Sequence, residues 1–209
     1  MKKKLILISI MLVVIFLIVF FVFYREKEKN KNKNFVMYIE EGYMVNKDLY
    51  LTGISMNGKV SIGDELEVVG NGTKEVTVKD IIVDNKSVKK YSGKKRFSVS
   101  IGETDIEDLK RGTALATKDA VKETQKVVMK ITLDAETQVQ VKKGSVLVFK
   151  IGFENYAGTV DINDSLVATQ TGEIEVTFDD KVPAYKDAEV VVKYDGLNTI
   201  GTGKIIELK

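Results

Sequence analysis

The chain has 209 residues with 32 basic and 30 acidic side chains. Eight of the basic and two of the acidic residues precede residue 34, so that residues 34–209 carry a net charge of −4. A region with this slight negative charge lacks the broad basic surface of a nucleic-acid-binding protein, which argues against nucleic acid as a partner. The chain contains neither Cys nor His, which excludes thiolate nucleophiles, Ser-His-Asp triads and the usual zinc sites.

A long apolar segment, Leu5 to Tyr24, lies close to the start of the chain. At about 1.5 Å per residue, a helix of this length spans roughly 30 Å, the thickness of a bilayer core. The alternative is a cleaved signal peptide, whose apolar region is only about 7–15 residues long and ends in small residues. This segment instead ends in Phe23 and Tyr24, followed by Arg25. We therefore predict that residues 1–24 form a short tail and the single transmembrane helix of a cell-membrane protein.

The charges that flank this segment leave two orientations open. Three lysines precede it, and five basic residues follow within ten, so that counting Lys and Arg places the C-terminal side in the cytoplasm. A short basic tail before a long apolar run is, however, the usual form of a signal anchor, which favours a soluble region outside the cytoplasm. We take the second orientation as our prediction. Residues 25–34, REKEKNKNKN, are charged and of low complexity, and are predicted to form a flexible linker.

From Phe35 onward, short β-rich runs alternate with turn signals, which is typical of an all-β fold. In the first half we expect a type I′ hairpin turn at Asn57-Gly58, a Gly63-Asp64 turn and a short helix over 104–110. The expected strands of this half cover 49–55, 60–62, 65–69, 75–83 and 96–101. Those of the second half cover 127–133, 146–153, 159–162, 173–178, 189–194 and 199–208. The only proline, Pro183, is expected at a turn or strand edge.

The charged stretch 118–123 between the two groups of strands predicts a domain boundary. It divides the remaining chain into residues 35–117 and residues 118–209. Each part is long enough to bury a core of its own as a small β-barrel. We therefore predict two small β-barrels that follow the membrane helix and the linker.

Several segments carry a family resemblance. The first half contains FVMYIEE at 35–41, Thr52-Gly53, GKVSIGDELEVVG at 58–70 and IEDLKRGTALA at 106–116, and the second half contains FKI at 149–151, GTV at 158–160 and GLNTIGTGKII at 196–206. In this order and at these separations, they resemble the second and third domains of elongation factor Tu and related translational GTPases. The resemblance covers residues 35–209 and implies two β-barrels of that family's kind.

The GTPase part of that family is missing from the sequence. It contains no GxxxxGK[ST] loop to bind phosphates and no NKxD guanine motif, because the stretch Asn85–Val88 lacks the acid. We therefore expect no GTP and no other cofactor. In the family, the second domain also holds the end of aminoacyl-tRNA with a carboxylate and an arginine. The matching positions here are Ile82 and Asn85, which argues against tRNA binding.

The densest cluster of positive charge lies between residues 86 and 96. It comprises Lys86, Lys89, Lys90, Lys94, Lys95 and Arg96, interleaved with the aromatic residue Tyr91 and followed by Phe97. One interpretation is a surface for an anionic partner: lipid, nucleic acid or an acidic protein. The other is a solvated loop whose lysines keep a sheet edge soluble, with Phe97 in the core. The sequence leaves both open.

No catalytic or metal site is predicted. The adjacent acids Glu40-Glu41 and Asp179-Asp180 point to opposite faces if they lie on strands, so that neither pair shares a site. The sequence after Asp161 begins like a calcium loop but has Leu166 where that loop needs glycine. We therefore predict a membrane-anchored, non-catalytic binding or scaffold module with a protein partner. The alternatives are a translation-linked accessory or decoy protein that mimics elongation factor Tu at the cytoplasmic face, and a hydrolase with an unrecognised carboxylate site.

Overall fold

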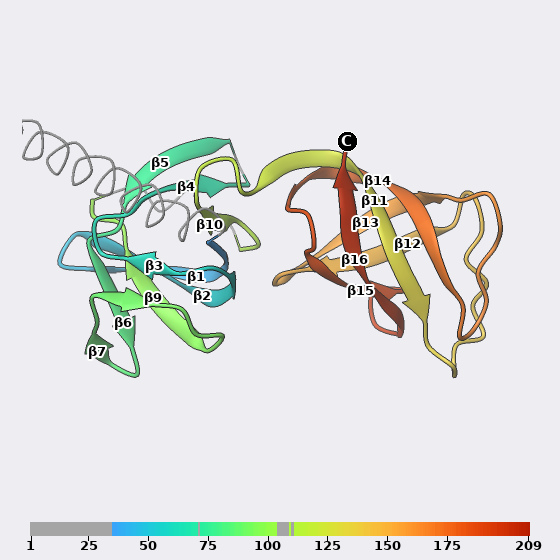
Figure 1. Ribbon diagram of the computed structural model, residues 1–209, viewed down its shortest axis with the longest axis horizontal. Helices are drawn as coiled ribbons and strands as arrows, with labels where there is room; N and C mark the ends of the chain where they lie inside the picture. Colours follow the sequence, from blue (N-terminus) through green and yellow to red (C-terminus); the bar gives the residue numbers. More distant parts are fainter. Residues whose placement is uncertain (1–34, 71, 104–108, 110) are drawn as a thin grey trace, which may run out of the picture.

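The computed structural model describes residues 35–70, 72–103, 109 and 111–209. The predicted transmembrane segment, the predicted linker and most of the predicted helix over 104–110 lie outside the described residues. Within the described ranges the chain forms sixteen strands in two units (Figure 1). No helix in these ranges has the length and apolar character needed to cross a membrane. The prediction of an all-β fold is confirmed for this part of the chain.

The first unit is an antiparallel sheet of eight strands, in the order β5-β4-β10-β1-β2-β9-β6-β7. The strands are β1 (Val36–Val45), β2 (Asp48–Asn57), β4 (Glu65–Val69), β5 (Thr73–Thr77), β6 (Asp80–Val83), β7 (Lys86–Ser87), β9 (Arg96–Ser100) and β10 (Ala114–Ala116). Two short strands, β3 (Val60–Ser61) and β8 (Lys90–Tyr91), pair with each other as a separate sheet. Among the described residues the ladder of the large sheet does not close, so that a closed barrel is not observed in this unit.

The second unit is a closed barrel of six strands, in the order β11-β14-β13-β12-β15-β16. Its strands are β11 (Lys122–Leu133), β12 (Val146–Ile151), β13 (Glu154–Asp161), β14 (Thr171–Ala184), β15 (Glu189–Lys193) and β16 (Thr199–Leu208). Along β11, Val127, Met129, Ile131 and Leu133 are buried while Lys126, Lys130 and Thr132 are exposed. This alternation with period two directs one face of each strand into the barrel. The predicted barrel and its six strands are confirmed here.

The predicted hairpin at Asn57-Gly58 is wrong. Strand β2 pairs with β1 and β9, whereas β3, which follows the turn, pairs with β8. Two other tight turns have the positive φ angles of a type I′ hairpin. They are Asn46-Lys47 between β1 and β2, with φ of 50° and 75°, and Asp84-Asn85 between β6 and β7, with φ of 49° and 62°.

Strand β1 contributes to two hydrophobic cores. Met37 and Ile39, with Phe35 just before the strand, belong to the core of the first unit. Val36 and Tyr38 belong instead to the core that contains the side chains of the second unit. Because successive side chains of a strand point to opposite faces, one strand can serve both cores. The two units therefore share a hydrophobic core across their contact.

Tyr38 lies at the centre of this contact. Its hydroxyl donates a hydrogen bond of 3.0 Å to the carbonyl oxygen of Pro183. Its ring lies against the backbone of Gly152, where an added Cβ atom would come within 2.6 Å of Tyr38 Cδ2. Burial raises the pKa of Tyr38 well above its usual value, with Tyr185 and Tyr156 adding to the effect. Strand β14 pairs with β13 only as far as Phe178, so that Pro183, further along, has a neighbouring strand on one side only, β11. Its predicted place at a strand edge is confirmed.

An ion pair between Arg111 and Glu154, with 3.2 Å between Nε and Oε1, also joins the two units. The Arg111 side chain is more than half exposed, so that this pair contributes little to stability by itself. The shared core and the Tyr38 hydrogen bond therefore carry most of the contact.

Candidate functional site

The structure brings most of the predicted basic cluster to one end of the first unit. Register places Lys86 opposite Val83 and Arg96 opposite Ile54, while Lys90 and Tyr91 pair with Ser61 and Val60. The last pairing also brings Lys59, which precedes Val60, beside Tyr91. We name the resulting surface the basic end. It consists of Lys59, Lys86, Lys89, Lys90, Lys94 and Lys95.

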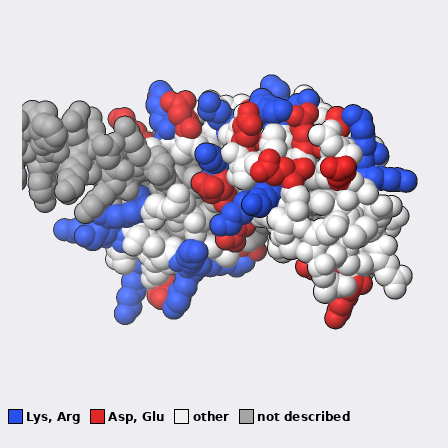
Figure 2. Space-filling view, turned by 45° about the vertical axis from the view of Figure 1, so that its right-hand side comes forward, with Lys and Arg blue, Asp and Glu red and all other residues white. Residues whose placement is uncertain are grey.

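Within the described ranges, no carboxylate lies within ion-pair distance of any of these six lysines. Five of them are exposed and Lys59 is half-buried. Figure 2 shows basic side chains gathered over the lower part of the left-hand unit. A concavity of about 380 Å³ lies between Lys59 and Lys90, with Tyr91, Ser92 and Gly93 as its other walls. The basic end therefore offers positive charge that no acidic group in the described part of the chain neutralises directly.

Arg96 differs from the neighbouring lysines. Its guanidinium forms an ion pair with the Glu40 carboxylate, whose side chain is 22% exposed. Asp80 is likewise engaged, because its Oδ1 accepts hydrogen bonds from the Ser87 hydroxyl at 2.6 Å and the Ile81 N–H at 2.9 Å. We therefore leave Arg96 out of the basic end, although the sequence placed it there.

The aromatic residues of the cluster have a structural role. Phe97 is buried, with 3% of its surface exposed, and the Tyr91 ring packs on it with 4.5 Å between ring centroids. The Lys95 N–H donates a hydrogen bond of 3.2 Å to the Tyr91 hydroxyl oxygen, which fixes the loop over 92–95. Phe97 lies in the core, as the second of the two interpretations of this cluster requires. Its face is not available for stacking on a nucleic-acid base.

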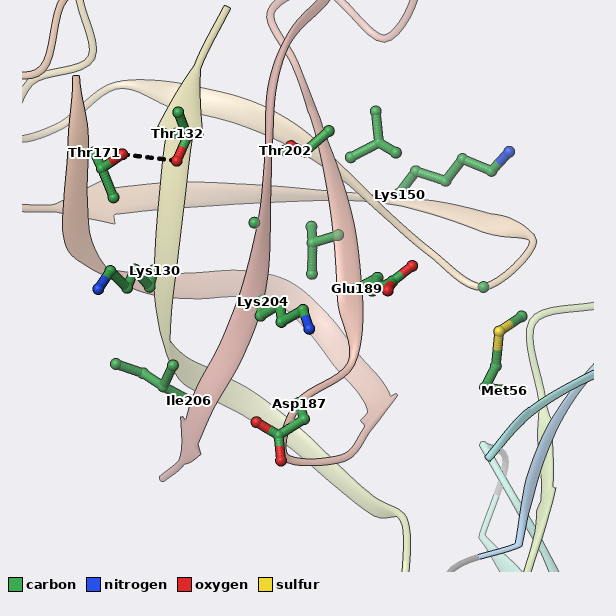
Figure 3. A pocket seen from close by; sticks show the side chains of 14 residues that line it. Met56, Lys130, Thr132, Lys150, Thr171, Asp187, Glu189, Thr202, Lys204 and Ile206 are labelled. Carbon is green, nitrogen blue, oxygen red and sulfur yellow. Dashed lines mark hydrogen bonds between the residues drawn. The ribbon is translucent and has the colours of Figure 1, made fainter. Parts of the chain in front are cut away.

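A second candidate surface lies where the two units meet. A cavity of about 730 Å³ lies against the outer face of the barrel strands β11, β16, β15 and β12. A smaller cavity of about 340 Å³ adjoins it beside Tyr38. The two share four lining residues, namely Met56, Gly152, Asp187 and Glu189. We name the combined depression the joint groove. Figure 3 shows Met56 reaching toward it from the first unit, opposite the barrel strands that carry Lys204 and Glu189.

The floor of the joint groove includes a row of threonine side chains across three strands, β14, β11 and β16. The Thr132 and Thr171 hydroxyls lie 2.8 Å apart in a hydrogen bond, and Thr132 is opposite Thr202. Two residues along each strand, Lys130 and Lys204 lie directly opposite each other. Like charges in this arrangement destabilise a sheet, and the two side chains point away from each other (Figure 3).

Acidic residues flank these lysines without pairing with them. Glu173 is opposite Lys130, and Glu189 is opposite Lys204, but among the described residues neither lysine has an ion pair within 4.0 Å. At the end of the groove beside Tyr38, burial raises the pKa of Tyr185 to about 12, and Glu189 and Asp187 contribute. The sequence did not predict this groove, because its walls come from strands that are far apart in the chain.

The adjacent acids singled out in the sequence have different surroundings. Glu40 is paired with Arg96, whereas Asp179 and Asp180 are exposed residues within β14. No three His, Cys, Asp or Glu side chains in the described ranges are grouped so that they could hold a metal ion.

Comparison with known proteins adds no family assignment. No protein-family model matches the chain, and no curated protein matches it significantly.

Proposed function

We propose that this chain is a membrane-anchored binding module without catalytic activity of its own. Residues 5–24 span the cell membrane, and the two β units lie outside the cytoplasm. The units correspond to the second and third domains of elongation factor Tu, without its GTPase. The all-β fold, the closed six-stranded barrel and the segments quoted above support this correspondence. The missing phosphate-binding loop supports a role that uses no GTP.

The partner binds in the joint groove and is an extended segment of another protein. The observation that carries this proposal is the composition of the groove wall. Lys130 and Lys204 occupy opposite positions on neighbouring strands with no ion pair among the described residues, beside the apolar side chains of Met56 and Ile206. A segment with acidic and apolar side chains would relieve the repulsion between the lysines and cover the apolar groups. The larger cavity of the joint groove, at about 730 Å³, has a volume in the range of common ligand sites.

The test uses the absence of native cysteine. A single Thr202→Cys variant of the full-length chain is labelled with a thiol-specific photo-crosslinker in isolated membranes and then irradiated. The matched control is Thr159→Cys, at an exposed threonine of β13 outside the groove. We expect one discrete adduct from position 202, which mass spectrometry identifies, and none from position 159.

A charge-reversed background sharpens the result. Lys130→Glu with Lys204→Glu should abolish the adduct from position 202, whereas Lys142→Glu with Lys181→Glu, at exposed positions of the same unit, should leave it intact. Equal adducts from both labelled positions, or an adduct indifferent to the charge reversal, would exclude the joint groove as the binding site.

A further inference from the structure

The chain enters the first unit beside the basic end. The Phe35 N–H donates a hydrogen bond of 3.2 Å to the Thr117 hydroxyl oxygen, and Val36 then pairs with Asn57. Asn57 is only two residues from Lys59. Because Arg96 lies opposite Ile54, the loop that carries Lys94 and Lys95 is at the same end of the sheet. The point of attachment therefore lies at the end of the sheet from which the loop with Lys94 and Lys95 extends.

The length of the linker limits how far this end can lie from a bilayer. Ten residues, 25–34, separate the predicted membrane helix from Phe35. Fully extended, they reach at most about 35 Å, and as a flexible coil they span about 17 Å on average. This tether holds the lysines at a high effective concentration next to the lipid surface, where even weak attraction suffices for contact.

The chemistry of the basic end fits lipid headgroups better than nucleic acid. All six of its charges are lysines, which attract phosphate as point charges, whereas specific phosphate recognition favours the bidentate geometry of arginine. Phe97 is buried and Tyr91 is packed on it, which removes the aromatic platforms that single-stranded nucleic acid uses. The linker adds five basic residues against two acidic ones between the bilayer and this end.

We infer that the basic end docks on anionic phospholipid headgroups of the membrane in which the chain is anchored. The inference rests on the membrane anchor of the proposed function. Of the six lysines, only Lys94 also lines the joint groove, through its smaller cavity. Docking turns a loosely tethered module into one with a fixed face toward the bilayer. Each lysine within a Debye length of the surface strengthens the attraction by about fivefold.

The test uses the full-length chain reconstituted into vesicles of phosphatidylcholine alone or with phosphatidylglycerol. A donor dye on Ser92→Cys, in the loop of the basic end, reports proximity by energy transfer to headgroup-labelled lipid. Ser165→Cys, at an exposed position of the second unit, is the matched site. We expect transfer from position 92 to rise with phosphatidylglycerol and to fall with salt, and transfer from position 165 to change little.

Two charge variants provide the control. Replacing Lys86, Lys89, Lys90 and Lys95 by Gln, which leaves out Lys94 because it lines the joint groove, should remove the response to phosphatidylglycerol. The same replacement at the exposed second-unit residues Lys122, Lys142, Lys181 and Lys186 changes the net charge equally and should preserve it. Equal transfer in both kinds of vesicle, or equal loss in both variants, would overturn the inference. So would tight binding of single-stranded RNA or an acidic peptide to the basic end at a salt concentration where lipid docking is absent.

Flotation of the vesicles at high salt distinguishes failure of the docking from failure of the membrane anchor. If the chain does not float with the vesicles, the predicted membrane helix is wrong and the proposed function fails with it. If it floats but position 92 does not respond to anionic lipid, the anchor stands and only the docking is refuted.

Discussion

The Tyr38 hydroxyl donates a hydrogen bond of 3.0 Å to the carbonyl oxygen of Pro183, across 145 residues of sequence and from one unit to the other. Because the bond is buried, Tyr38→Phe should lower the free energy of unfolding by about 1–3 kcal/mol. Chemical denaturation of the full-length chain in detergent measures this loss. Tyr194→Phe, at a position that is 55% exposed, should change stability by less than about 0.5 kcal/mol. Equal effects of the two variants would show that the bond contributes nothing measurable.

Gly152 permits the close approach of Tyr38. An added Cβ would come within 2.6 Å of Tyr38 Cδ2, and the φ of +59° disfavours any other residue. Gly144, with a φ of +81° but no atom within 4 Å of an added Cβ, is the matched control because it has only the backbone strain. Gly152→Ala should therefore destabilise the protein by about 1–3 kcal/mol more than Gly144→Ala does. Thermal or chemical unfolding of both variants tests this difference, and equal losses would contradict the contact.

Stability should fall at alkaline pH. Burial raises the pKa of Tyr156 to about 12, with Glu154 contributing, and raises that of Tyr38 well above its usual value. The folded state thus keeps protons that the unfolded chain releases near pH 10, so the stabilisation is complete below pH 10 and is lost as pH rises through 12. Unfolding free energies measured between pH 9 and 12 should decrease, and less steeply in Tyr38→Phe and Tyr156→Phe. An unchanged slope in both variants would refute this assignment.

Two buried threonines should respond in opposite ways to replacement by valine. The Thr113 hydroxyl is buried and has no hydrogen-bond partner among the described residues, so that Thr113→Val should leave stability unchanged or raise it by up to about 1 kcal/mol. The Thr124 hydroxyl donates a hydrogen bond of 2.7 Å to the Lys209 carbonyl oxygen. Thr124→Val should therefore cost about 1–3 kcal/mol. Chemical unfolding of the two variants measures both changes. A loss of about 1–3 kcal/mol in Thr113→Val would show that the Thr113 hydroxyl does have a hydrogen-bond partner.

The side of the membrane on which the units lie can be tested with one engineered cysteine. Leu197 is 85% exposed at the turn between β15 and β16, and the native chain has no cysteine to give a background. A membrane-impermeant maleimide should label Leu197→Cys in intact cells if the units lie outside the cytoplasm. Labelling only after permeabilisation would place them inside. Ribosomes and partners of elongation factor Tu would then be the first baits, as the decoy alternative requires.

The strands of the second unit could be predicted closely, whereas some turns of the first could not. The predicted range 199–208 coincides with β16, and the predicted range 127–133 covers the part of β11 in which buried and exposed side chains alternate. Asn57-Gly58 has hairpin chemistry, but tertiary pairing takes β3 to β8 instead. The real tight turn at Asn46-Lys47 contains no glycine, and its positive φ angles depend on the pairing of β1 with β2 on either side.

The basic end could be predicted in part, and the joint groove could not. Five of its six lysines are near one another in sequence and were found as a charge cluster. Lys59 joins them only through the pairing of Val60 with Tyr91. The engagement of Arg96 by Glu40, 56 residues away, was equally invisible in the sequence. Lys130 and Lys204 become neighbours only when the barrel closes.

The core shared by the two units has a consequence for the order of events during synthesis. Val36 and Tyr38 leave the ribosome early, but the barrel that covers them closes only when β16 pairs with β11. Until residues 199–208 have emerged, one face of β1 has no permanent cover, and the nascent protein exposes apolar surface that chaperones and proteases recognise. Strand β16 thus completes the core that buries Val36 and Tyr38, and a product that lacks this strand would expose them to proteolysis.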